Sequence, residues 1–107
     1  MKNKSSLQNQ ILKSIPADEK RVWNTLTALP LEQKKFIWKL IKNSNKEGLI
    51  VYKQDIKHLH YLQSKGLISI NSLYKSRSGE VSLFVLRDAP YLQRMLRNMA
   101  RKKVGFS

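Results

Sequence analysis

The spacing of hydrophobic residues predicts two helices in the first half of the chain. Val22, Trp23, Leu26 and Leu29 recur at helical spacing, and Pro30 follows, where a helix ends or changes direction. Residues 31–43 predict a second helix, whose apolar face is formed by Phe36, Ile37, Leu40 and Ile41. Aromatic side chains at such spacing are usually buried, so Trp23, Phe36 and Trp38 are expected in the core rather than in a binding surface.

The middle of the chain combines one helical period with runs of strand period. Ile56, Leu59 and Leu62 form one apolar helical face, and Gly66 follows where a left-handed residue commonly ends a helix. Apolar residues at 49–52, 67–70 and 81–86 predict strands, and the last two runs are joined by a basic loop at 75–79. The pattern therefore predicts a helix that leads into a β-hairpin.

The C-terminal stretch predicts an amphipathic helix. Asp88, Ala89 and Pro90 resemble a helix start with proline in the first turn. The apolar stripe consists of Leu92, Met95, Leu96 and Met99, and the opposite face carries Arg94, Arg97 and Arg101.

The charge of the chain points to a polyanionic partner. Twenty-one Lys and Arg residues stand against seven Asp and Glu in 107 residues, which gives a net charge of +14. Such a charge repels itself unless an anionic partner neutralises it. The apolar runs are far shorter than the roughly 20 residues that span a bilayer, and no secretory signal is recognised. Since the chain has no cysteine, no disulfide can form, and we expect a cytoplasmic protein.

One segment resembles a known family. The run from Ile56 to Ile68, IKHLHYLQSKGLI, is similar to the end of the recognition helix and the first wing strand of winged helix-turn-helix domains. The resemblance covers roughly residues 31–87 and implies DNA binding through a helix and a basic hairpin. The family places two helices before the wing, but only 14 residues separate Tyr52 from Leu67 here. That leaves room for one helix of about three to four turns, so the two-helix unit that reads DNA in this family is shortened here.

These patterns give an α+β, mostly helical fold. The expected organisation is a flexible basic arm at 1–16, a winged-helix-like domain at 17–87, and a basic amphipathic helix with a tail at 88–107.

The candidate binding residues share a positive charge or a hydrogen-bonding or stacking side chain on an exposed face. They are Lys53, Gln54, Lys57, His60, Tyr61, Lys65, Lys75, Arg77, Arg94, Arg97, Arg101, Lys102 and Lys103. Lysine and arginine contact phosphates, glutamine reads adenine, and tyrosine stacks on unpaired bases. The alternative for the central helix is a solvated surface. The arginine stripe has two alternatives, a solvated face or contact with an anionic membrane.

The sequence offers little for catalysis or metal binding. His58 and His60 point about 200° apart on a helix and cannot share one ion, and the seven acidic residues are scattered. There is no G-x-S-x-G motif, and the glycines form no phosphate-binding loop. We expect no enzyme activity, no metal and no cofactor.

The sequence thus predicts a small non-enzymatic protein that binds single- or double-stranded DNA mainly through phosphates. It would act in transcription regulation or as a replication accessory of a mobile element. The alternative is an adaptor that docks on a larger replication or regulatory protein, which would itself handle the nucleic acid.

Overall fold

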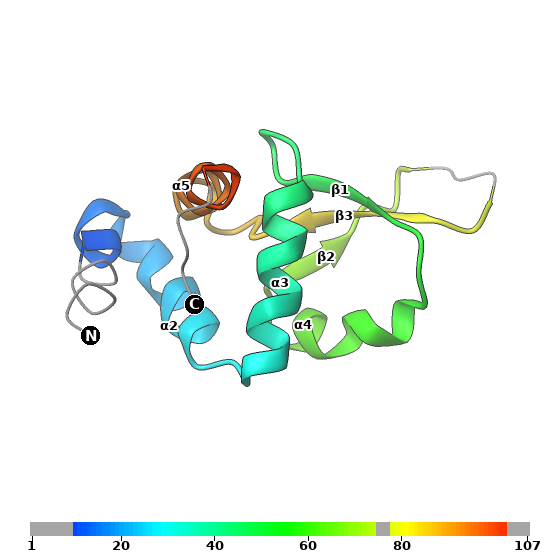
Figure 1. Cartoon of the computed structure of the whole chain (residues 1–107), viewed down its shortest axis with the longest axis horizontal. Coiled ribbons are helices and arrows are strands. Elements are labelled where there is room, and N and C mark those ends of the chain that lie inside the picture. Colours follow the sequence, from blue (N-terminus) through cyan, green and yellow to red (C-terminus); the bar gives the residue numbers. More distant parts are fainter. Residues whose placement is uncertain (1–9, 75–77, 103–107) are drawn as a thin grey trace.

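The computed structural model describes residues 10–74 and 78–102 and forms a small, mostly helical α+β domain. Its elements, in order, are η1 (Ala17–Glu19), α2 (Lys20–Thr27), α3 (Leu31–Asn43), β1 (Leu49–Tyr52), η2 (Ile56–Leu59), α4 (His60–Ser64), β2 (Ile68–Ile70), β3 (Val81–Val85) and α5 (Pro90–Arg101), as Figure 1 shows. The mostly helical α+β class predicted from the sequence is therefore confirmed, and the bounds of α3 and β1 match the predicted ones.

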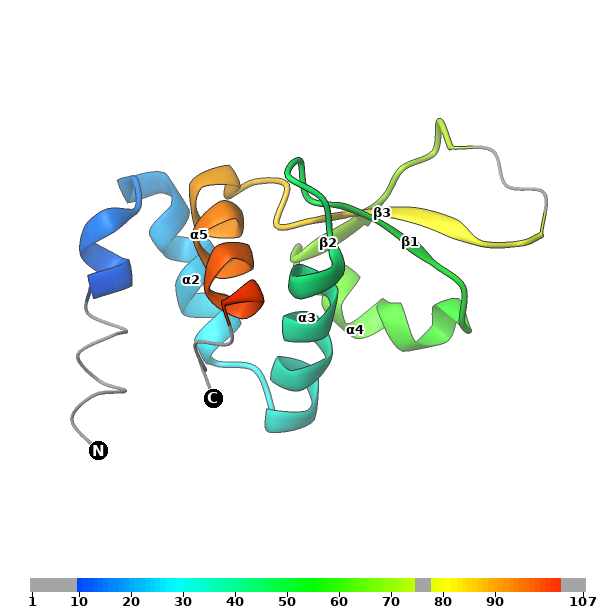
Figure 2. The same ribbon diagram turned by 45° about the horizontal axis from the view of Figure 1, so that its top comes forward.

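The strands form one antiparallel sheet in the order β1-β3-β2. In the register, Ile50 lies opposite Leu83 on β3, and Ile68 of β2 lies opposite Val85. These inward-facing residues alternate with an outer row that includes Val51 and Phe84. In Figure 2 the α3 and α4 helices lie on one side of the sheet. The core therefore lies between the sheet and these helices.

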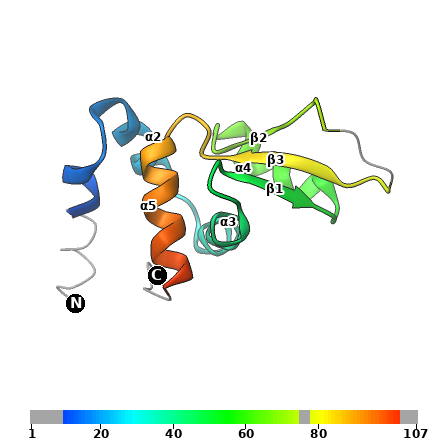
Figure 3. The same ribbon diagram turned by 90° about the horizontal axis from the view of Figure 1, so that it is seen from above.

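The C-terminal helix belongs to the same core. Leu92 and Leu96 of α5 are fully buried, together with Trp23 and Leu26 of α2. Figure 3 shows α5 beside α3, which is seen end-on. The helix predicted as an extension after residue 88 is thus a structural part of the domain, because its apolar stripe packs against α2 and α3.

The predicted flexible arm is wrong for residues 10–16. Residues 10–14 are helical, and the side chains of Ile11 and Ile15 are 2% and 5% exposed in the core. The two isoleucines are four residues apart, so one helical turn brings both to the same face. Residues 1–9 of the arm lie outside the described residues.

The helix between β1 and β2 is shorter than predicted. It consists of the four-residue 3-10 turn η2 and the five-residue α4. It starts at Ile56 because the Asp55 side chain accepts a hydrogen bond from the Lys57 N–H, which fixes the start of the helix. Leu59 and Leu62 are buried as expected, whereas Ile56 is 44% exposed and was wrongly placed on the apolar face. It is the first residue of the segment, with no further turn beside it.

Two turns that follow these elements have left-handed residues. Gly66 ends α4 with a φ of 74°, as predicted. Leu86 has a φ of 54° and lies outside β3, so the predicted strand at 81–86 is one residue too long. The Leu86 N–H still donates to the Leu67 carbonyl at 2.8 Å, in the register of the β2–β3 pairing, and the left-handed Leu86 then turns the chain out of the strand. No helix in residues 10–74 and 78–102 is long and apolar enough to cross a membrane.

Candidate nucleic-acid interface

A basic groove lies between β3, α5 and the turn that follows α3. Its volume is about 640 Å³. It is lined by Lys46, Glu47, Phe84, Val85, Leu86, Arg87, Pro90, Gln93, Arg94, Arg97 and Asn98, and we call it the arginine groove. Four of these residues are cationic and only Glu47 is acidic, so the groove favours an anionic ligand.

Two of its arginines are held against aromatic rings. The guanidinium carbon of Arg87 lies 4.5 Å from the centre of the Phe84 ring, and that of Arg94 lies 5.6 Å from the centre of the Tyr91 ring. Both distances fall within the roughly 6 Å of a cation–π contact. Such contacts restrict the side chains before a ligand arrives, which lowers the entropy lost when a phosphate is bound.

A third arginine is held by the backbone at the end of α3. The Arg97 Nε donates a 2.7 Å hydrogen bond to the Ser44 carbonyl, and Arg101 reaches the same oxygen at 3.5 Å. Ser44 is the C-cap of α3, where the helix dipole is negative and favours a cation. Gln93, which is buried, donates to the Ser44 hydroxyl at 3.2 Å. Arg97 therefore fastens α5 to α3 as well as lining the groove.

Sequence reasoning found Arg94 and Arg97 but missed Lys46 and Arg87. Arg87 follows directly after Leu86, whose left-handed conformation ends the strand and places the next residue in the groove. A usable signal was that cations follow the ends of two predicted elements, at residues 46 and 87.

The candidates on η2 and α4 form a separate exposed surface. Lys57, His60, Tyr61 and Lys65 are all exposed, as predicted. The Lys65 Nζ lies 5.6 Å from the centre of the Tyr61 ring, so these two side chains are neighbours. Lys65 also lines a small hollow together with Arg21 of α2 and Asp88.

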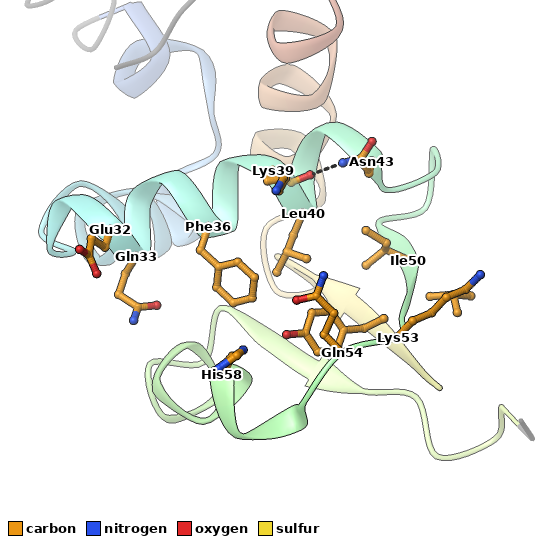
Figure 4. A pocket seen from close by; sticks show the side chains of 12 residues that line it. Glu32, Gln33, Phe36, Lys39, Leu40, Asn43, Ile50, Lys53, Gln54 and His58 are labelled. Atoms are coloured by element: carbon orange, nitrogen blue, oxygen red, sulfur yellow. Dashed lines mark hydrogen bonds between the residues drawn. The ribbon is translucent and has the colours of Figure 1, made fainter. Parts of the chain in front are cut away.

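Lys53 and Gln54 lie in a second groove, between α3 and the segment from β1 to η2. This groove of about 580 Å³ is lined by Glu32, Gln33, Phe36, Lys39, Leu40, Asn43, Ile50, Val51, Tyr52, Lys53, Gln54 and His58, and we call it the α3–β1 groove. Figure 4 shows Gln33 and Phe36 pointing from α3 toward the opposite wall, where Gln54 and His58 lie.

The aromatic residues of this groove form a fixed pair. The rings of Phe36 and Tyr52 meet edge to face with their centres 6.2 Å apart. The Tyr52 hydroxyl donates to the Asp55 carbonyl at 3.3 Å. Burial raises the pKa of Tyr52 above its ordinary value of 10.0, and the nearby Asp55 carboxylate raises it further. Tyr52 therefore stays neutral.

The predicted site residues thus divide among three places. Arg94 and Arg97 share the arginine groove, with Arg101 beside the same carbonyl as Arg97; Lys102 is exposed at the end of α5. Tyr61 and Lys65 meet on α4, and Lys53 and Gln54 meet in the α3–β1 groove. Lys75, Arg77 and Lys103 lie outside the described residues. Among residues 10–74 and 78–102, no three His, Cys, Asp or Glu residues are grouped so that they could hold a metal ion.

Comparison with known proteins finds no family, no curated protein and no solved structure that matches this chain.

Proposed function

We propose that this protein is a non-enzymatic DNA-binding protein of winged-helix-like architecture that holds DNA mainly through its phosphates. The observation that carries the proposal is the arginine groove. Three arginines of the groove are positioned before a ligand binds. Arg87 contacts the Phe84 ring and Arg94 contacts the Tyr91 ring. Arg97 donates to the Ser44 carbonyl. Arginine suits this role because its planar guanidinium group can bind two phosphate oxygens at once.

The order of the elements supports the winged-helix-like part of the proposal. A helix, α3, leads into β1, a helical segment follows, and then β2 and β3 form a hairpin. The order β1-β3-β2 places β1 beside the second hairpin strand. A helix that leads into a hairpin is what the sequence resemblance implies, with the β2–β3 loop as the wing, but one short helical segment stands here in place of the family's two helices.

The short helical segment favours phosphate contacts over reading of bases. With four residues in η2 and five in α4, only a few side chains can approach the base edges in a major groove. We infer that sequence specificity is low, which suits an accessory role in replication or a role in transcription regulation.

The test is a mobility-shift titration with the double variant Arg87→Ala/Arg94→Ala. The matched control is Lys35→Ala/Lys42→Ala, which removes two exposed charges from α3 outside both grooves. The arginine variant loses two phosphate contacts, so its affinity for DNA should fall far more than the affinity of the control variant. Equal weakening of both would reject the arginine groove as the binding site. Unchanged DNA binding by the arginine variant would likewise reject the groove, and failure of the wild type to shift DNA would favour the adaptor alternative.

A further inference from the structure

We propose that the α3–β1 groove holds an unpaired base of single-stranded DNA. This inference rests on the proposed DNA binding and adds a second kind of contact to it, because the arginine groove offers charge and the α3–β1 groove offers an apolar floor with amide groups at its walls.

The floor of the groove is suited to a flat aromatic ligand. Phe36 and Leu40 come from α3, and Ile50 and Tyr52 come from β1. Figure 4 shows the Phe36 ring pointing into the groove, where the edge-to-face contact with Tyr52 fixes its position. Bases stack on aromatic side chains whatever their sequence. The volume of about 580 Å³ falls within the roughly 300–1,000 Å³ of pockets that hold small molecules.

The walls offer hydrogen bonds that match the edge of a base. Gln33 on α3 and Gln54 after β1 each carry an amide that both donates and accepts. The Gln33 Oε1 is buried and has no hydrogen-bond partner within the described part of the chain. An acceptor left in this state lowers stability. Rotation of the Gln33 side-chain amide would present its Oε1 to the amino group of a bound base.

The charges at the groove favour a strand over a free base. Two cations, Lys39 on α3 and Lys53 after β1, stand on opposite walls, against one acidic lining residue, Glu32 in the first turn of α3. In Figure 4 the Lys53 side chain extends away from the centre of the groove. A phosphate that contacts Lys53 would therefore lie outside the floor, as the phosphates of a continuous strand would. A base in a duplex is stacked and paired, so it has no free face or edge to offer.

The test compares three DNA probes of one length with the full chain: an intact single strand, the same strand with abasic sites throughout, and the duplex. The abasic strand keeps every phosphate and lacks every base. We expect the intact strand to bind roughly tenfold more tightly than the abasic strand, as one base–aromatic stack implies. Equal affinity would overturn the base pocket and leave the phosphate-binding proposal standing. Failure of all three probes to bind would overturn both proposals.

Variants locate the effect in this groove. Gln54→Ala changes an exposed residue and should reduce the preference for the intact strand without unfolding the protein, and Phe36→Leu should reduce it further. Lys39→Ala should weaken single-strand binding more than Lys35→Ala, which removes the same charge one turn away on α3 but outside the groove. If Gln54→Ala and Phe36→Leu fold as the wild type does and retain the full preference for the intact strand, the base is bound elsewhere and the inference is wrong.

Discussion

The Glu19 carboxylate accepts a 2.8 Å hydrogen bond from the backbone N–H of Leu92, 73 residues later in the chain. It also accepts a hydrogen bond from the N–H of Tyr91 at 3.2 Å. The Glu19 side chain is buried, with 3% of its surface exposed, and these two hydrogen bonds satisfy its carboxylate. The residue before α5 is Ala89, which has no side chain that can cap a helix. Glu19 therefore supplies from η1 the cap that the sequence suggested for Asp88, and it fixes the helix that carries Arg94 and Arg97.

Replacing Glu19 should destabilise the domain. Glu19→Ala leaves two N–H groups at the start of α5 without their acceptor, which should lower the free energy of unfolding by about 1–3 kcal/mol. Glu19→Gln keeps one acceptor oxygen and should cost less. Chemical denaturation measures both. Asp18→Ala, an exposed neighbour, serves as the control, with an expected change within about 0.5 kcal/mol. Equal effects of Glu19→Ala and Asp18→Ala would contradict the capping role.

Alanine variants of Arg97 and Arg94 should differ in stability, although both should bind DNA more weakly. Arg97→Ala removes a charge-assisted hydrogen bond to the Ser44 carbonyl and should cost about 1.5–3 kcal/mol of stability as well as DNA affinity. Arg94→Ala removes an exposed cation–π contact and should cost less than about 1 kcal/mol while still weakening DNA binding. Denaturation and mobility-shift titrations of the two variants check this. A stable Arg97→Ala protein would show that the contact with Ser44 does not hold α5 to α3.

Replacement of Gly48 should destabilise the domain, because there is no room for a Cβ atom at this position. It has a φ of 82°, and a Cβ there would lie 2.8 Å from the Val85 carbonyl oxygen. Gly79 has the same φ with open space around it, so Gly79→Ala measures the backbone strain alone, about 1–2 kcal/mol. Gly48→Ala should destabilise the domain by clearly more in thermal unfolding. If the two variants unfold alike, the turn that carries Lys46 tolerates a side chain.

The raised pKa of Tyr52 predicts a pH dependence at the alkaline end. Because the pKa in the folded chain lies above the ordinary 10.0, the neutral phenol is favoured by folding. This contribution is fully present below pH 10 and is lost as the pH rises through the folded-state pKa. The pKa of Tyr74 is also raised, by burial and by Glu80, so spectroscopic titration of tyrosinate should lose one late-ionising group in Tyr52→Phe and keep the one that belongs to Tyr74. Asp55→Asn, which can still cap η2, should move that ionisation to lower pH.

Periodicity predicted the helices and strands because each buried face has its own local repeat. The helical spacing of Val22, Trp23 and Leu26 predicts α2 in this way, and the apolar run Leu49–Tyr52 predicts β1. The Glu19 cap and the Arg97 contact with Ser44 depend instead on residues distant in sequence. Nothing within a few residues of Glu19 shows that α5 will arrive beside it.

The same limit applies to the candidate site. The charge of +14 and the stripe of Arg94, Arg97 and Arg101 were visible in the sequence. That Arg87 and Lys46 would join Arg94 and Arg97 in one groove depends on the left-handed Leu86 and on the turn after α3. The division of the predicted residues among three surfaces also needed the tertiary structure.

The most direct test of phosphate-dominated DNA binding is the slope of log affinity against log salt concentration. For the wild type we predict a steep linear fall, because each phosphate contact contributes about 0.9 to the slope on duplex DNA. For Arg87→Ala/Arg94→Ala the slope should be smaller by about two contacts, or roughly 1.8. An affinity for DNA that is unchanged between low and physiological salt would contradict the account.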